Sequence, residues 1–223
     1  KETSFTVTKL TEEETEKQAH KLFGDEHPAY INGYNDNTFR PNNLITRAEV
    51  AAIITRISPK YNPLRYYLSK FEDVPMGQWY YNAVAFMENE KYISGYGDNT
   101  FRPNNPITRA EFTVMICKVN NIRPTSTRHD FEDVEGHWAE GYITALSRKK
   151  YINGYPNGEF QPDSPITRAE VVTIINRVLD REPDKEKMDM EIIINPFKDV
   201  PRHHWAYYDI LEAAETHYEK DWH

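Results

Sequence analysis

Three arginines share one local sequence, and their chemistry suits an anionic ligand. Each is the second residue of a Thr-Arg-Ala-Glu tetrapeptide, at Arg47, Arg109 and Arg168. The threonine and glutamate of the motif form a capping box, which predicts that the arginine is the first residue of a helix. A guanidinium beside the free N–H groups of a helix start can receive a carboxylate or a phosphate. The alternative is an ion pair within the protein, to Asp73, Asp133 or Asp199.

Aromatic residues and glycines recur with the arginines and suit a sugar. A tryptophan ring can pack against the C–H face of a sugar, although tryptophan is more often a core residue. A glycine that precedes a tyrosine lets a ligand approach the backbone closely, or simply permits a tight turn. The further candidate ligand-binding residues are Trp79, Trp138, Trp205, Gly33, Gly95, Gly154, Tyr34, Tyr96 and Tyr155.

Other residue patterns do not indicate catalysis, a metal or a cofactor. No unique nucleophile stands with a base and an orienting third group. The segment Asn35-Asp36-Asn37 lacks the closing glutamate of a calcium loop, and the histidines, His217 among them, lack zinc spacing. Cys117 is the single cysteine and aligns opposite the apolar stripe, which predicts a partly exposed thiol. We therefore expect no enzymatic activity, no metal and no cofactor.

The composition argues against several classes of partner. The 223 residues include 27 Lys plus Arg and 35 Asp plus Glu, so the net charge of −8 disfavours nucleic acid. No apolar run approaches the roughly 20 residues that cross a bilayer, so we expect no membrane insertion. The chain opens Lys-Glu-Thr-Ser-Phe, without an initiator methionine or a signal peptide. We expect a piece of a longer protein, monomeric in this form.

The motifs belong to a threefold repeat of short helices. Arg109 follows Arg47 by 62 positions and precedes Arg168 by 59. Apolar residues with helical spacing follow each tetrapeptide, and a Gly-Tyr…Phe-x-Pro connection precedes it. A second motif, Phe-x-Asp-Val followed by a tryptophan, also occurs three times and also leads an apolar stripe. The pattern predicts a mainly α fold, with short loops or hairpins joining the helices.

The two motifs are offset along the chain. The first Thr-Arg-Ala-Glu unit has no Phe-x-Asp-Val segment ahead of it, and the last such segment, Phe197–Val200, has no tetrapeptide behind it. Complete pairing requires the C-terminal segment to pack beside the first unit, which predicts a closed pseudo-threefold domain rather than an open solenoid. A helix from Thr11 to Phe23 is a rival for that place.

Five segments follow from this alignment. They are residues 1–27, an upstream remnant with a possible short helix; 28–69, the first repeat without its own first helix; 70–128, the second repeat; 129–180, the third; and 181–223, a linker and the closing segment.

The three motifs in this order resemble the S-layer homology (SLH) domains of bacterial surface proteins, over about residues 28–215. The resemblance implies a pseudo-threefold spindle around a central three-helix bundle. It also implies non-covalent anchoring at the cell wall or S-layer surface of a Gram-positive bacterium, with an extracellular location. The implied ligand is a secondary cell wall polysaccharide that carries pyruvylated N-acetylmannosamine.

In that family the arginine of the tetrapeptide reads the pyruvate carboxylate in grooves between repeats. The resemblance therefore gives this role to Arg47, Arg109 and Arg168. The third copy departs from the others at Asn157-Gly158-Glu159 and Gln161, so its groove is expected to differ. A protein-interaction or self-assembly module of a surface layer is the alternative. A wall hydrolase is disfavoured, because its acid and base should form a unique pair whereas repeats supply triplicates.

Overall fold

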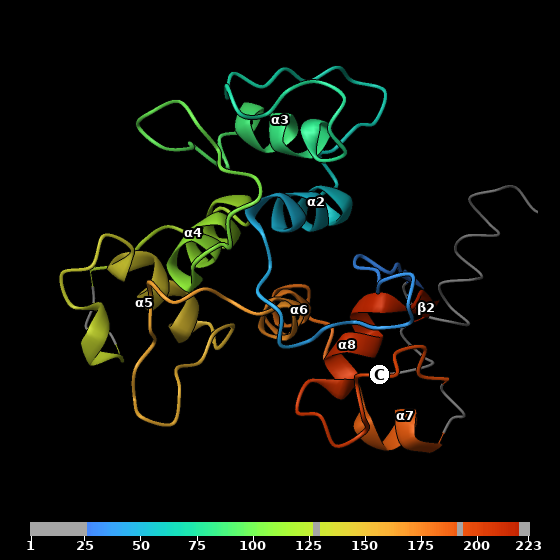
Figure 1. Cartoon of the computed structure of the whole chain (residues 1–223). Coiled ribbons are helices and arrows are strands. Elements are labelled where there is room, and N and C mark those ends of the chain that lie inside the picture. The colour runs from blue at the N-terminus through green and yellow to red at the C-terminus, as the bar shows by residue number, and fades with distance from the viewer. Residues whose placement is uncertain (1–25, 127–129, 191–193, 219–223) are drawn as a thin grey trace, which may run out of the picture.

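The computed structural model describes residues 26–126, 130–190 and 194–218, and it is mainly α-helical, as predicted (Figure 1). The elements are β1 (Glu26–His27), α2 (Arg47–Ile57), α3 (Tyr81–Asn89), α4 (Arg109–Val119), η1 (Glu132–Val134), α5 (Glu140–Arg148), α6 (Arg168–Val178), α7 (Lys185–Met190), α8 (Tyr207–Ala214) and β2 (His217–Tyr218). The rival helix expected from Thr11 to Phe23 lies outside the described residues. Within the described part, none of the helices combines the length and the apolar character needed to cross a membrane.

Helices α2, α4 and α6 begin at the repeated arginines, as the capping boxes predict. In α2 the Thr46 hydroxyl accepts a hydrogen bond from the Glu49 backbone N–H, and Glu49 Oε2 accepts one from the Thr46 N–H at 2.8 Å. Both halves of the box are also present at α4 and α6. Each box satisfies N–H groups that a helix start otherwise leaves without partners.

A closed ring of backbone hydrogen bonds holds these three helix starts together. Ile45 N–H donates to Ile166 O at 3.2 Å, Ile107 N–H to Ile45 O at 3.1 Å, and Ile166 N–H to Ile107 O at 3.0 Å. The three isoleucine side chains are buried. Helices α2, α4 and α6 consequently form the central bundle, with α3, α5 and α8 lying further out (Figure 1).

Each outer helix packs on the capped helix that precedes it in the chain: α3 on α2, α5 on α4, and α8 on α6. The helices begin two residues after Trp79, Trp138 and Trp205, so the predicted tryptophan-led helices are confirmed. Helix α7 lies in the segment predicted as a linker. It forms because Asp184 Oδ1 accepts the N–H groups of Glu186 and Lys187 at 3.0 and 3.1 Å.

The C-terminal Phe-x-Asp-Val segment lies beside the first repeat. Asp199 accepts the backbone N–H groups of Phe39 and Arg40, both at 2.8 Å. Asp73 binds Phe101 and Arg102 in the same way, at 2.8 and 2.7 Å. The last segment thus makes with the first repeat the contacts that the earlier segment makes with the second, which closes the pseudo-threefold ring. The five segment boundaries given above stay predictions.

The expectation for Cys117 was wrong, because α5 covers the face of α4 opposite the apolar stripe. The Cys117 side chain is 0% exposed, and its Sγ lies 3.7 Å from the carbonyl oxygen of Tyr142 in α5. Burial raises the pKa of this thiol to about 12. Cys117 is therefore a small core residue that stays protonated at neutral pH.

Candidate ligand-binding grooves

Three grooves of similar size, about 250, 270 and 240 Å³, are built from equivalent residues and are named here by their arginines. The Arg47 groove is lined by Arg47, Gly95, Tyr96, Glu111, Lys118 and Trp138 among others. The Arg109 groove is lined by Arg109, Gly154, Tyr155, Glu170, Arg177 and Trp205. The Arg168 groove is lined by Arg168, Asn32, Glu49, Arg56 and Trp79. Each groove takes its arginine from one repeat and its glutamate from the next tetrapeptide around the ring.

The arginines form the floor of the grooves and are held rigidly. Their exposed fractions are 5, 4 and 4% for Arg47, Arg109 and Arg168. Each Nε–H donates to a phenylalanine carbonyl oxygen of the neighbouring repeat: Phe101 at 2.7 Å, Phe160 at 2.8 Å and Phe39 at 2.9 Å. This bond fixes the plane of the guanidinium and turns its Nη groups toward the groove.

Each arginine faces a glutamate of the next capping box. Arg47 Nη1 lies 2.8 Å from Glu111 Oε1, and Arg109 Nη1 lies 2.9 Å from Glu170 Oε1. The third pair is looser, with 3.7 Å between Arg168 Nη1 and Glu49 Oε1. The predicted alternative of an ion pair within the protein is thus present, but its expected partners were wrong. Asp73, Asp133 and Asp199 instead accept pairs of backbone N–H groups.

The tyrosines after the repeated glycines stack beside the guanidinium groups. The Arg47, Arg109 and Arg168 Cζ atoms lie 4.8, 4.7 and 5.0 Å from the ring centroids of Tyr96, Tyr155 and Tyr34. The Tyr96 hydroxyl donates to Glu111 at 2.6 Å, and the Tyr155 hydroxyl donates to Glu170 at 2.8 Å. Burial and this bond to a carboxylate raise the pKa of both tyrosines. They therefore remain protonated donors that orient the glutamates.

Burial lowers the pKa of Arg168, and Tyr34 and Glu49 offset that effect only in part. The buried charge of the Arg168 guanidinium is therefore incompletely compensated by its neighbours.

The tryptophans lie at the groove walls rather than in the core. Their exposed fractions are 65% for Trp79, 62% for Trp138 and 58% for Trp205. The interpretation of these tryptophans as core residues was wrong. The residue that follows each tryptophan is buried instead: Tyr80, Ala139 and Ala206. The exposed indole faces are available to a ligand in the grooves.

The repeated glycines make room for phenylalanine rings. A Cβ atom at Gly33, Gly95 or Gly154 would lie 2.3, 2.2 or 2.5 Å from the ring of Phe197, Phe71 or Phe131, respectively. The close approach at these glycines is thus a packing contact with the Phe-x-Asp-Val motif. A ligand contact at the same glycines stays a prediction.

Two kinds of groove residue were not recognised in the sequence. The glutamates of the tetrapeptide were assigned to capping alone, yet Oε2 of Glu170 caps the helix while Oε1 faces Arg109. A second cation, Arg56, Lys118 or Arg177, lines each groove. The signal was present, because this cation follows the glutamate by seven residues, which places it two turns along the same helix face.

Fold and grooves together define a repeat-built helical domain with three equivalent ligand-sized sites. The model of the S-layer homology domain matches residues 29–51, 70–113 and 130–172. The chain belongs to the S-layer homology domain family. Family membership confirms the predicted class of cell-surface domain.

The chain is similar to several longer proteins. It is 35% identical to the cellulosome-anchoring protein of Acetivibrio thermocellus, over 95% of this chain and 48% of that protein. It is 26% identical to S-layer protein EA1 of Bacillus anthracis, over 73% of this chain and 18% of that protein. An amylopullulanase of Thermoanaerobacterium thermosulfurigenes is 32% identical over 68% of this chain, but only 8% of the enzyme is matched. The chain therefore corresponds to less than half the length of each of these relatives.

Proposed function

We propose that this chain is a non-catalytic module that anchors a protein to the bacterial cell wall by binding a secondary cell wall polysaccharide. The ligand is its pyruvylated N-acetylmannosamine, taken up in the grooves between repeats. The observation that carries the proposal is the threefold recurrence of a buried arginine fork beside an exposed tryptophan. The anchoring and S-layer functions named for two relatives support the same location at the cell surface.

Recognition of the carboxylate rests on the donors that the protein leaves available. In the Arg109 groove, three of the five guanidinium N–H groups donate to Phe160 O, Glu170 Oε1 and Asn153 O. The other N–H groups, together with the Arg177 side chain, form the receptor for a ketal-linked pyruvate carboxylate. The buried arginine thus supplies fixed donors, and the second cation adds a further positive charge to the groove lining.

The sugar ring makes its contacts on the tryptophan side of each groove. An indole face packs against C–H groups of a pyranose ring, and this contact needs no charge on the sugar. The carboxylate contact and the apolar contact thus address two different parts of one modified sugar. Because the net charge of the chain is −8, its long-range electrostatic field does not attract an anionic polymer. Binding therefore depends on short-range contacts inside the grooves.

Sedimentation with isolated cell walls tests the proposal against the protein-interaction alternative. The folded chain should co-sediment with untreated walls. It should stay in the supernatant when acid extraction has removed the polysaccharide from the walls. Variant Arg148→Gln, which changes an exposed arginine on α5 outside the groove linings, should behave as the wild type. Equal sedimentation with treated and untreated walls would show that the grooves take a protein or another wall component.

A further inference from the structure

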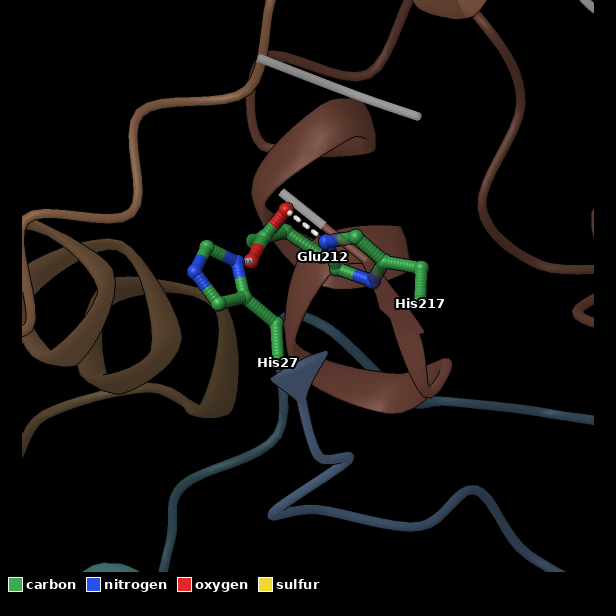
Figure 2. A group of neighbouring side chains, drawn as sticks. All are labelled: His27, Glu212 and His217. Carbon is green, nitrogen blue, oxygen red and sulfur yellow. Dashed lines mark hydrogen bonds and ion pairs between the residues drawn. The ribbon is translucent and has the colours of Figure 1, made fainter. Parts of the chain in front are cut away.

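Three side chains with metal-ligand chemistry meet at a place remote from the grooves. His27 lies on β1, Glu212 on α8, and His217 on β2 (Figure 2). The two strands pair antiparallel with His27 opposite His217. Directly opposed residues of an antiparallel pair project from the same face. Figure 2 shows both imidazole rings directed toward the Glu212 carboxylate, which lies between them.

The ligand atoms of the cluster are close together and shielded from solvent. His27 Nδ1 lies 3.0 Å from Glu212 Oε1, and His217 Nε2 lies 2.9 Å from Glu212 Oε2. The side chains of His27, Glu212 and His217 are 12, 0 and 4% exposed. One ligand atom from each residue can be chosen so that all lie within 4.8 Å of one another. Small side-chain shifts would therefore bring one ion within bonding distance of all three residues.

The hydrogen bonding of His217 leaves a lone pair on Nε2 that can bind a cation. Its Nδ1 lies 3.0 Å from the carbonyl oxygen of Glu215. A carbonyl oxygen only accepts, so Nδ1 carries a hydrogen, and the Nε2 of the neutral ring then bears a lone pair. That lone pair faces a carboxylate oxygen at 2.9 Å. Two such atoms attract each other only when a proton or a metal ion lies between them.

We propose that His27, Glu212 and His217 form a binding site for a divalent transition metal, with Zn²⁺ as the favoured ion. Two imidazole nitrogens and one carboxylate oxygen are a ligand set that zinc takes, with a fourth position open to water. The observed 3.0 and 2.9 Å join each imidazole nitrogen to a different oxygen of Glu212. Tetrahedral zinc with ligands about 2.0 to 2.2 Å away holds them about 3.3 to 3.5 Å apart, so binding needs only small shifts of these side chains. The bond from His217 Nδ1–H to a backbone carbonyl is typical of zinc-binding histidines.

A neighbouring cation reduces the expected affinity. Arg181 Nη1–H donates to the carbonyl oxygen of Pro28 at 3.1 Å, next to His27 in the chain. Its positive charge opposes a second cation nearby and stabilises the Glu212 carboxylate without metal. We therefore expect a single zinc site that is weaker than a four-ligand structural site.

A metal at this position would strengthen ring closure rather than glycan binding. It would join β1, which precedes the first repeat, to α8 and β2 of the closing segment. The sequence expectation of no metal rested on local spacing, whereas His27 and Glu212 are 185 residues apart. The antiparallel pairing of β1 with β2 places His27 beside His217, and Glu212 joins them from α8.

Titration calorimetry of the whole chain with ZnCl₂, after removal of metals with a chelator, tests the site. One saturable site per chain is expected, with a rise in Tm on zinc addition. Glu212→Gln, which preserves shape, and His217→Gln should each weaken zinc binding by roughly tenfold or more. His203→Gln, which changes an exposed histidine outside the cluster, should bind zinc as the wild type does.

The proposal is overturned if the wild type shows no saturable site, since a proton then fills the position between His217 and Glu212. It is also overturned if Glu212→Gln binds zinc as tightly as the wild type. The wild-type titration and the Glu212→Gln comparison decide the question even if His217→Gln fails to fold.

Discussion

The Arg109 and Arg168 grooves have the same motif but different charge compensation. In the Arg109 groove the guanidinium lies 2.9 Å from Glu170, and the Tyr155 hydroxyl donates to that carboxylate at 2.8 Å. In the Arg168 groove the distance to Glu49 is 3.7 Å, and no hydrogen bond joins Tyr34 to Glu49 in the described part of the chain. A repeated motif therefore sets which residues meet, and the local packing sets how strongly they pair.

This difference has a consequence for ligand binding. A guanidinium that pairs tightly with a glutamate offers less to a ligand carboxylate, because the glutamate already offsets its positive charge and takes one of its N–H donors. Burial lowers the pKa of Arg168, in keeping with its looser pairing. We expect the Arg168 groove to bind the pyruvylated sugar most strongly of the three.

Replacing the arginines one at a time gives the largest expected contrast. Arg168→Gln should lower the affinity for isolated cell wall about ten- to hundredfold, because charge-assisted hydrogen bonds contribute about 1.5 to 3 kcal/mol. Arg109→Gln should lower it less than about threefold, because Glu170 already occupies that guanidinium. Quantitative sedimentation measures both, with circular dichroism as the check on folding. A larger loss for Arg109→Gln would reverse the proposed order of the grooves.

The partner glutamates provide the matched experiment on stability. Glutamine can complete the capping box with its amide oxygen, while its NH₂ group replaces the carboxylate oxygen that faces the arginine. Glu170→Gln and Glu49→Gln therefore each keep the helix cap and lose the ion pair. Glu170→Gln should reduce the free energy of unfolding by about 2 to 3 kcal/mol, because the buried Arg109 loses its carboxylate. Glu49→Gln should cost less than about 1 kcal/mol, since its pair is looser.

Urea denaturation measures these free energies, and glycan titration of the same variants adds a second test. Glu170→Gln should also bind the pyruvylated sugar more tightly, since its competitor for Arg109 is removed. Equal stability losses in the two variants would mean that the Arg109–Glu170 pair at 2.9 Å and the Arg168–Glu49 pair at 3.7 Å stabilise the fold equally, which contradicts the prediction.

Ionic strength should have the smallest effect. Binding that depends on buried arginines is screened less than binding by an exposed basic surface. Raising NaCl from about 0.05 to 0.3 M should weaken glycan binding by no more than about twofold. A steep loss of affinity, measured by titration at several salt concentrations, would instead indicate contacts with exposed lysines and arginines.

The parts of the fold with local causes could be predicted from the sequence. The capping boxes fixed the starts of α2, α4 and α6, and the offset of the motifs indicated the closure by Phe197–Val200. The arginine partners could not be predicted, because each glutamate uses one carboxylate oxygen within its own helix and the other across a repeat boundary.

The solvent exposure of the tryptophans also could not be predicted from the sequence. The indole of Trp205 lies at the surface, whereas the next residue, Ala206, is buried. Which of the two is buried depends on how α8 packs against α6. The cluster of His27, Glu212 and His217 likewise depends on pairing between distant strands, which no local spacing records.

Calorimetric titration with two forms of one disaccharide, with and without the pyruvate ketal on N-acetylmannosamine, tests the central claim most directly. The ligand changes while the protein stays the same, so folding of a variant plays no part. The proposed grooves predict saturable binding of the pyruvylated form and at least tenfold weaker binding of the unmodified form. Equal affinities for the two, or no binding of the pyruvylated form, would contradict the claim that Arg47, Arg109 and Arg168 read a pyruvate carboxylate.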